Sequence, residues 1–168
     1  NRGEIALRVI RACREMGIAS VAVHSTADAD AMHVRMADEA ICIGPPPSAQ
    51  SYLSFPAIIS ACEITGAQAI HPGYGFLSEN AGFAKEVEEH GITFIGPSTH
   101  AIEVMGDKLA AKNAVSDYDI PMVPGVNHAV TEADEAKAIA NEKDYPVQIN
   151  ESAGSGGKGI RVVEHDDE

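Results

Sequence analysis

Apolar residues recur along the first hundred positions in two alternating patterns, one with helical spacing and one typical of short buried strands. The helical pattern predicts helices at residues 1–16, 31–37, 51–65 and 79–89. The short apolar runs predict strands at residues 20–24, 40–43, 67–70 and 92–95. Strands that alternate with helices over short loops indicate a parallel α/β layer. In such a layer a strand feeds the turn at 1–3, so we expect the first strand of the sheet to be missing.

Polar residues before several of these helices are candidates for N-caps, which accept hydrogen bonds from the first free backbone N–H groups. Asn1 is the predicted cap of the first helix, with Glu4 in the capping-box position three residues later. Ser78 is predicted to cap the helix at 79–89, and Thr131 is predicted to cap a helix that ends at Lys143.

The pattern changes after Pro97, where two short helices at 101–105 and 108–116 precede a connector rich in proline and glycine. A helix at 131–143 and strands at 145–149 and 160–163 follow. The predicted fold class is therefore α/β, a parallel-sheet domain followed by a small α+β unit. We expect three segments: a domain at 1–97, connecting helices and a linker at 98–125, and a partial second domain at 126–168.

Composition excludes several classes of protein. The formal net charge is −13 and no run of Lys or Arg occurs, which argues against nucleic-acid binding. No apolar run approaches the roughly 20 residues of a transmembrane helix. Cys13, Cys42 and Cys62 lie singly in apolar sequence and are predicted to be reduced core thiols. The seven histidines form no metal-binding pattern, so no metal site is predicted.

The loop between the last two strands is the sharpest local signal. It runs from Ser152 to Gly159 and has glycine at four of its eight positions. Glycines let backbone N–H groups approach a ligand closely, and Lys158 adds a cation, so the loop could cover the phosphates of a nucleotide. A glycine-rich hairpin without a ligand accounts for the same residues equally well.

A second candidate segment, His71–Asn80, follows a predicted strand, and open α/β sheets bind ligands beyond the carboxyl ends of their strands. Tyr74 and Glu79 could face a cleft there. From local sequence alone, a tight turn packed by Phe76 and Leu77 is the favoured interpretation.

Charged residues elsewhere have weaker signals. Lys108 near a helix start is by itself an ordinary solvated side chain. Arg8, Arg11 and Glu15 share one polar face of the first helix, which by itself indicates plain surface.

Taken together, seven segments resemble one family, biotin carboxylase or the biotin carboxylase domain of an acyl-CoA or pyruvate carboxylase. They are Asn-Arg-Gly-Glu-Ile-Ala at 1–6, Ala-Val-His-Ser at 22–25, Ile-His-Pro-Gly-Tyr-Gly-Phe-Leu-Ser-Glu-Asn at 70–80, Phe-Ile-Gly-Pro at 94–97, Met-Gly-Asp-Lys at 105–108, Val-Pro-Gly at 123–125 and the loop at 152–159. The resemblance covers essentially the whole chain. It implies a preATP-grasp domain followed by the start of an ATP-grasp domain, whose small lid subdomain closes over ATP.

The resemblance also implies an activity, in which MgATP and bicarbonate form carboxyphosphate, which then carboxylates biotin held on a carrier protein. The implied partners are a biotin carboxyl carrier protein or domain, carboxyltransferase subunits and a second copy of the full-length chain. Acetyl-CoA carboxylase in fatty acid biosynthesis is one such system, and the implied location is the cytoplasm, or the mitochondrial matrix in a eukaryote.

The resemblance assigns roles to residues. Lys108 would contact the ATP phosphates and Ile160 would line the adenine pocket. Tyr74 would lie beside the biotin site, while the face with Arg8, Arg11 and Glu15 would form the dimer interface. The loop residues implied to bind ATP are Ser152, Gly154, Ser155, Gly156, Gly157, Lys158 and Gly159.

The chain departs from the family pattern in two ways. Asn150 stands where the family has a lysine on the phosphates, Glu151 adds an anion beside it, and Ser155 interrupts the glycine run. The loss of one charge-assisted contact costs about 1.5–3 kcal/mol. The Mg²⁺ ligands and catalytic groups belong to a lobe that would follow Glu168, so we expect this chain alone to be inactive. Two alternatives remain, a non-catalytic assembly domain with a decayed nucleotide site and another ATP-grasp ligase such as a carbamoyl-phosphate synthase.

Overall fold

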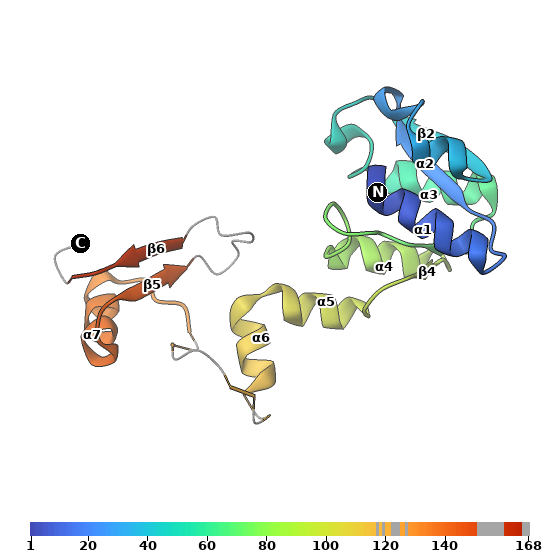
Figure 1. Ribbon diagram of the computed structural model, residues 1–168. Coiled ribbons are helices and arrows are strands. Elements are labelled where there is room, and N and C mark those ends of the chain that lie inside the picture. The colour runs from blue at the N-terminus through green and yellow to red at the C-terminus, as the bar shows by residue number, and fades with distance from the viewer. Residues whose placement is uncertain (117, 119, 122–124, 127, 151–159, 166–168) are drawn as a thin grey trace. The chain divides into compact units, whose positions relative to one another are not determined.

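The computed structural model describes residues 1–116, 118, 120, 121, 125, 126, 128–150 and 160–165. The chain forms two compact units, Asn1–Ile102 and Glu103–Glu168. Each unit has its own secondary structure (Figure 1) and is described by itself.

The first unit consists of two pairs of parallel strands with helices between them (Figure 1). Strand β1 (Val21–Ser25) pairs with β2 (Glu39–Gly44), and β3 (Ala69–Ile70) pairs with β4 (Thr93–Phe94). The helices of this unit are α1 (Gly3–Glu15), α2 (Met32–Met36), α3 (Phe55–Thr65) and α4 (Ala81–Glu89), with 3₁₀ turns at Thr26–Asp28 and Ser48–Gln50. Helix α5 (Thr99–Gly106) contains the boundary between the two units. The predicted parallel α/β arrangement is confirmed.

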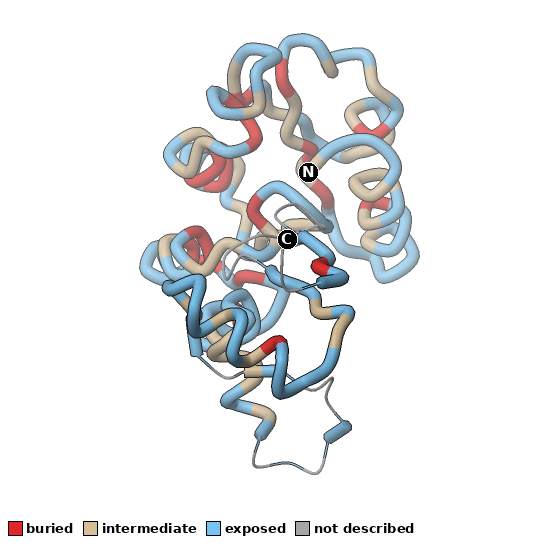
Figure 2. Tube along the Cα trace, turned by 90° about the vertical axis from the view of Figure 1, so that its left-hand side faces the viewer, coloured by how far each residue is buried: buried red, intermediate tan, exposed pale blue. Residues whose placement is uncertain are grey.

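An aromatic cluster forms the centre of the core in this unit. Phe83 is 1% exposed, and its ring centroid lies 5.1 Å from that of Phe55 and 6.2 Å from that of Phe94. Buried residues of α3 and α4 belong to the same core cluster, and Figure 2 colours the buried residues of the chain red. Burial of apolar area at roughly 25 cal/mol per Å² makes this cluster the main source of stability.

The three predicted helix caps are wrong. Arg2 is the residue that precedes α1, and it makes no side-chain cap bond; the Asn1 side-chain oxygen, which would be the capping acceptor, accepts from the Arg2 backbone N–H at 3.1 Å. Helix α4 is capped by Asn80, whose side-chain oxygen accepts from the Phe83 N–H at 2.8 Å, and not by Ser78. Glu132 precedes α7 (Ala133–Lys143), with no side-chain bond to the helix.

Two further expectations need correction. The helix predicted from residue 51 begins at Phe55, because Ser51 and Tyr52 belong to a turn that buries both side chains. All three cysteines are free as predicted, but Cys42 is exposed and only Cys62 is buried. Cys42 alternates along β2 with the buried Ile43 and therefore points to the other face of the strand.

The second unit contains helices α6 (Lys108–Val115) and α7 and an antiparallel strand pair. Strand β5 (Val147–Asn150) pairs with β6 (Ile160–Val163), so the predicted strands on either side of the glycine-rich loop are confirmed. In the part of the chain that is described, no helix is both long and apolar enough to cross a membrane.

Candidate functional site

The carboxyl ends of β1 and β3 carry the polar and aromatic side chains that make the first candidate site. The segment after β3 is His71–Asn80, and the segment after β1 ends in the 3₁₀ turn that contains Asp28. This is the edge at which open parallel sheets bind ligands.

Asp28 is the centre of a hydrogen-bond network at this edge. Its Oδ2 atom accepts from Ser25 Oγ at 2.7 Å, from the Tyr52 hydroxyl at 2.7 Å and from an Arg2 guanidinium nitrogen at 3.2 Å. The Tyr52 oxygen in turn accepts from the Ser25 backbone N–H at 3.0 Å. The network joins the start of α1, the end of β1 and the turn before α3.

The pKa values of this network follow from its contacts. Partial burial by itself raises the pKa of Asp28, but the hydrogen bonds from Tyr52, Ser25 and Arg2 outweigh it, so the pKa lies below its ordinary value. Burial, together with the bond to Asp28, raises the pKa of the Tyr52 phenol. Asp28 is therefore an anion and Tyr52 a neutral donor.

Phe76 connects this network to the segment after β3. Its ring stacks on Tyr52 with a centroid distance of 5.3 Å and an interplanar angle of 8°, while the Arg2 guanidinium lies over the Tyr52 ring at 5.4 Å. The backbone of Phe76 has φ 46°, a left-handed conformation that costs a non-glycine residue about 1–2 kcal/mol. Such strain persists where surrounding contacts over-determine the conformation.

Asn1 holds the same segment at its other end. The Nδ2 amide donates to the Pro72 carbonyl at 2.8 Å and to the Tyr74 carbonyl at 2.6 Å. Gly73, between these two residues, has φ 68°, and a Cβ atom there would lie 2.8 Å from Asn1 Nδ2. The approach of the amide therefore requires glycine at position 73.

The predicted site residue Tyr74 lies on this held segment and is 65% exposed. Glu79 is also exposed, whereas Leu77 is 6% exposed and belongs to the core. The packed turn and the exposed candidate side chains thus occur together in one segment.

The predicted nucleotide residues belong to the second unit. Lys108 is the exposed first residue of α6, whose N-cap Asp107 accepts from the Ala110 N–H at 2.7 Å. Asn150 pairs with Ile160 across β5 and β6, and its side-chain oxygen accepts from Gln148 Nε2 at 2.8 Å. The loop residues Ser152–Gly159 lie outside the described residues. Among the described residues, no group of three or more His, Cys, Asp or Glu side chains could hold a metal ion.

Arg8, Arg11 and Glu15 are exposed on one face of α1, as the helical spacing predicts. Together with Glu4, Leu7 and Ala12 they line a shallow hollow on that helix.

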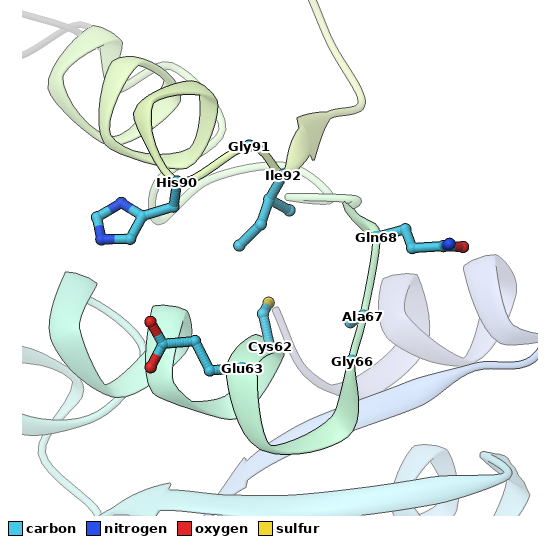
Figure 3. Close-up of a pocket in the computed structure, with 8 residues that line it drawn as sticks. All are labelled: Cys62, Glu63, Gly66, Ala67, Gln68, His90, Gly91 and Ile92. Atoms are coloured by element: carbon cyan, nitrogen blue, oxygen red, sulfur yellow. The ribbon is translucent and has the colours of Figure 1, made fainter.

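A pocket of about 290 Å³ opens at the other edge of the strands, beside the residues that precede β3 and β4 (Figure 3). Cys62 of α3 and His90 at the end of α4 line it, together with the turn at Gly66. Burial raises the pKa of the Cys62 thiol, which keeps it protonated and unreactive. The side chains that line this pocket do not form a catalytic or metal-binding arrangement.

Sequence reasoning missed the residues that hold the first site, namely Arg2, Asp28, Tyr52 and the amide of Asn1. One local signal was present, since Ser25 ends β1 and Asp28 lies in the turn that follows it. The partner of Asp28 lies 24 residues further on, and no local pattern indicates that contact.

The first unit is thus an α/β domain with a held loop at the carboxyl ends of its parallel strands, the edge at which open α/β sheets bind ligands. The second unit has an antiparallel strand pair on either side of a glycine-rich sequence. The family model described as biotin carboxylase, N-terminal domain, matches residues 1–102, and the chain belongs to this family. The model of the carbamoyl-phosphate synthase L chain ATP-binding domain matches residues 107–168.

Individual relatives agree with the family. The chain is 58% identical over 164 residues to biotin carboxylase of Pseudomonas aeruginosa, which covers 97% of the chain and 36% of the relative. It is 55% identical to the mitochondrial propionyl-CoA carboxylase alpha chain of Rattus norvegicus, of which it covers 23%. The chain therefore spans little more than a third of the first relative and about a quarter of the second.

Solved structures give the same result. A complex of biotin carboxylase from Campylobacter jejuni with a β,γ-ATP compound matches with a TM-score of 0.96 at 49% identity, over 99% of this chain and 37% of that one. The biotin carboxylase domain of 2-oxoglutarate carboxylase from Hydrogenobacter thermophilus, in complex with MgADP and bicarbonate, matches with a TM-score of 0.93 at 50% identity, over 99% of this chain and 37% of that one.

Proposed function

We propose that the protein containing this chain is a biotin carboxylase, an ATP-grasp ligase that uses ATP and bicarbonate to carboxylate biotin on a carrier protein. The observation that carries this proposal is the likeness along both units to proteins named as biotin carboxylases. The division into segments at 1–97, 98–125 and 126–168 belongs to the same proposal.

In this proposal the second unit contributes one side of an ATP site. The cation of Lys108 offsets phosphate charge, and the loop Ser152–Gly159 covers the phosphates. Facing residues of an antiparallel pair lie on the same side of a sheet, so Ile160 and Val162 share a face with Asn150 and Gln148. Ile160 and Val162 are 46% and 54% exposed. This open apolar surface supports contact between Ile160 and an adenine ring.

Asn150 provides a sharp test of the ATP site. Asn150→Lys places a cation on that open face, and we expect ATP to bind about 10- to 150-fold more tightly because one charge-assisted contact is gained. Isothermal titration of the full-length protein with ATP measures the change. Gln148→Lys is the matched control, since it adds the same charge to the same face and also removes the bond between Gln148 and Asn150. Equal effects of the two variants would rule out a specific role for position 150.

The first unit contributes Tyr74 beside the biotin site and, through Arg8, Arg11 and Glu15, a dimer interface. Support for these roles comes from the exposure of all four side chains. The partners are a biotin carboxyl carrier protein or domain and carboxyltransferase subunits, as in acetyl-CoA carboxylase. The location is the cytoplasm, or the mitochondrial matrix in a eukaryotic cell.

Phosphate release from ATP by the full-length protein tests the reaction. We expect release that requires bicarbonate and is accelerated by free biotin, with carboxybiotin as a product. Activity with bicarbonate and an ammonia donor in place of biotin would indicate a carbamoyl-phosphate synthase. Absence of any turnover would indicate the non-catalytic assembly domain, which Asn150 and Glu151 favour slightly and the two intact family segments at 70–80 and 105–108 oppose.

A further inference from the structure

Two independent contacts hold the segment Pro72–Leu77 from opposite ends. At one end the Asn1 amide donates both of its hydrogens to the carbonyls of Pro72 and Tyr74. An amide can supply two donors from one nitrogen, whereas an ionised carboxylate of the same shape supplies none. The contact therefore depends on the chemistry of Asn1 and not on its size alone.

The residue between the two carbonyls fits this contact. Gly73 takes φ 68°, and an added Cβ would lie 3.0 Å or less from three atoms of the Asn1 side chain. The Gly73 N–H donates to His71 Nδ1 at 3.0 Å, which closes the turn on its far side. Pro72, Gly73 and Tyr74 are thus fixed at their backbone atoms.

At the other end the hold comes from Tyr52. Its ring stacks on Phe76, and its hydroxyl is bound to Asp28, which also binds Arg2. Arg2 follows Asn1 directly, so the residues that precede α1 contribute the first contact and support the second through Asp28. The ring of Tyr52 is 2% exposed and cannot shift without disturbing the core.

Tyr74 lies between these two holds. Its carbonyl is bound, its neighbour two residues on is stacked, and its own side chain is 65% exposed. The backbone of Tyr74 is therefore held in place while its side chain stays accessible to a ligand. We infer that Asn1 is a positioning residue, whose amide clamps the turn at Gly73 and, with the Tyr52–Asp28 pair behind Phe76, presents Tyr74 to biotin. The clamp stands on geometry alone, and only the ligand that Tyr74 meets rests on the proposed function.

Asn1→Asp tests the clamp with almost no change in volume, because it replaces both donors by a carboxylate that faces two carbonyl oxygens. Amide hydrogen exchange of the full-length protein, followed by mass spectrometry, should show peptides within residues 71–77 exchanging about tenfold faster or more, with α3 and α4 unchanged. Asn113→Asp is the matched control, since it adds the same charge at an exposed position of α6 and should leave residues 71–77 unaffected.

Enzyme kinetics distinguish a role of Asn1 in positioning Tyr74 from a general effect of Asn1 on stability. We expect Asn1→Asp to raise KM for free biotin about tenfold while KM for ATP stays the same, because only the presentation of Tyr74 changes. If Asn1→Asp fails to fold, Gly73→Ala provides the same test, since its Cβ displaces the Asn1 amide.

Unchanged exchange in residues 71–77 would overturn the clamp. Faster exchange with equal changes in both KM values, or with none, would overturn the role in presenting Tyr74. A protein without any biotin-dependent turnover would refute the proposed function, while the exchange measurement would still decide whether the clamp exists.

Discussion

The two units of the chain differ in how much apolar surface each one buries. Of the buried apolar side chains in the described ranges, all but Ala140 and Val163 belong to Asn1–Ile102. In the second unit, Ile149, Ile160 and Val162 are about half exposed. Buried apolar area stabilises a folded unit, so within the described residues the first unit has the larger apolar core. Segments that rearrange around ligands come from regions of low stability. Among the described residues, the unit that contains the proposed lid is the one that buries less apolar surface.

The largest difference in unfolding free energy between variants of the two units should come from removing an aromatic side chain from the core of the first unit. Phe83→Ala is expected to lower the free energy of unfolding of the first unit by about 3–5 kcal/mol, because it leaves a cavity between Phe55 and Phe94. Val163→Ala in the second unit removes two carbons and should cost about 1.6 kcal/mol at ~0.8 kcal/mol per carbon. Urea titration followed by hydrogen exchange of each unit measures both. Equal losses of unfolding free energy in Phe83→Ala and Val163→Ala would contradict the difference in buried apolar area between the two units.

A smaller difference between the units concerns how stability depends on pH at two histidines, one in each unit. His33 of α2 is 1% exposed against α1 and β1, and neither ring nitrogen has a partner that meets hydrogen-bond geometry. Burial lowers the pKa of His33, and the nearby Val23 backbone and Asp28 offset this only in part. His128 in the second unit is exposed and lies 3.0 Å from Glu135 Oε1.

The sign of the pH effect follows from this burial. Between the lowered pKa and the unfolded value of about 6.5, the unfolded chain binds a proton that folded His33 does not. Its contribution to stability is present above about pH 6.5 and is lost as the pH falls through the folded pKa, with a slope of at most about 1.4 kcal/mol per pH unit. Urea titrations from pH 5 to 8 should show a slope that His33→Phe removes and His128→Phe keeps. A slope unchanged in His33→Phe would contradict this assignment.

The smallest contrast compares two helix starts within the second unit. Asp107→Ala removes the cap of α6 and should cost about 1 kcal/mol, with a loss of helical circular dichroism on urea titration. Glu132→Ala at the start of α7 removes the same charge but no cap bond, and should cost less. If both variants lose the same free energy, the Asp107 bond adds nothing beyond its charge.

The sequence predicted the alternation of elements well and their ends less well. Apolar spacing found β1, β2, α3 and the β5–β6 pair, because burial imposes that spacing on strands and helices. The caps failed because several polar residues precede each helix, and only the tertiary contacts decide among them. Asn1 lies one residue before the N-cap position, where its side-chain oxygen accepts from the Arg2 N–H and its Nδ2 amide binds carbonyls more than 70 positions away.

In the candidate site, too, local sequence predicted exposure better than it predicted contacts between distant residues. Tyr74 and Glu79 could be predicted to be accessible because they follow a strand that ends at the ligand-binding edge. Leu77 packs in the core as predicted, whereas Phe76 stacks on Tyr52 but remains 38% exposed. The Asp28–Tyr52 contact could not, because Tyr52 was assigned to a helix and its turn depends on the contact itself.

The Asn1 clamp also has a consequence for the order of folding. It joins residues 73 positions apart, and closing so long a loop is unfavourable until other contacts have brought the ends together. The clamp should therefore form after the folding transition state. Asn1→Asp is then expected to accelerate unfolding while leaving the refolding rate nearly unchanged, which stopped-flow measurements in urea would detect. The turn that presents Tyr74 would be the last part of the first unit to become ordered and the first to be released.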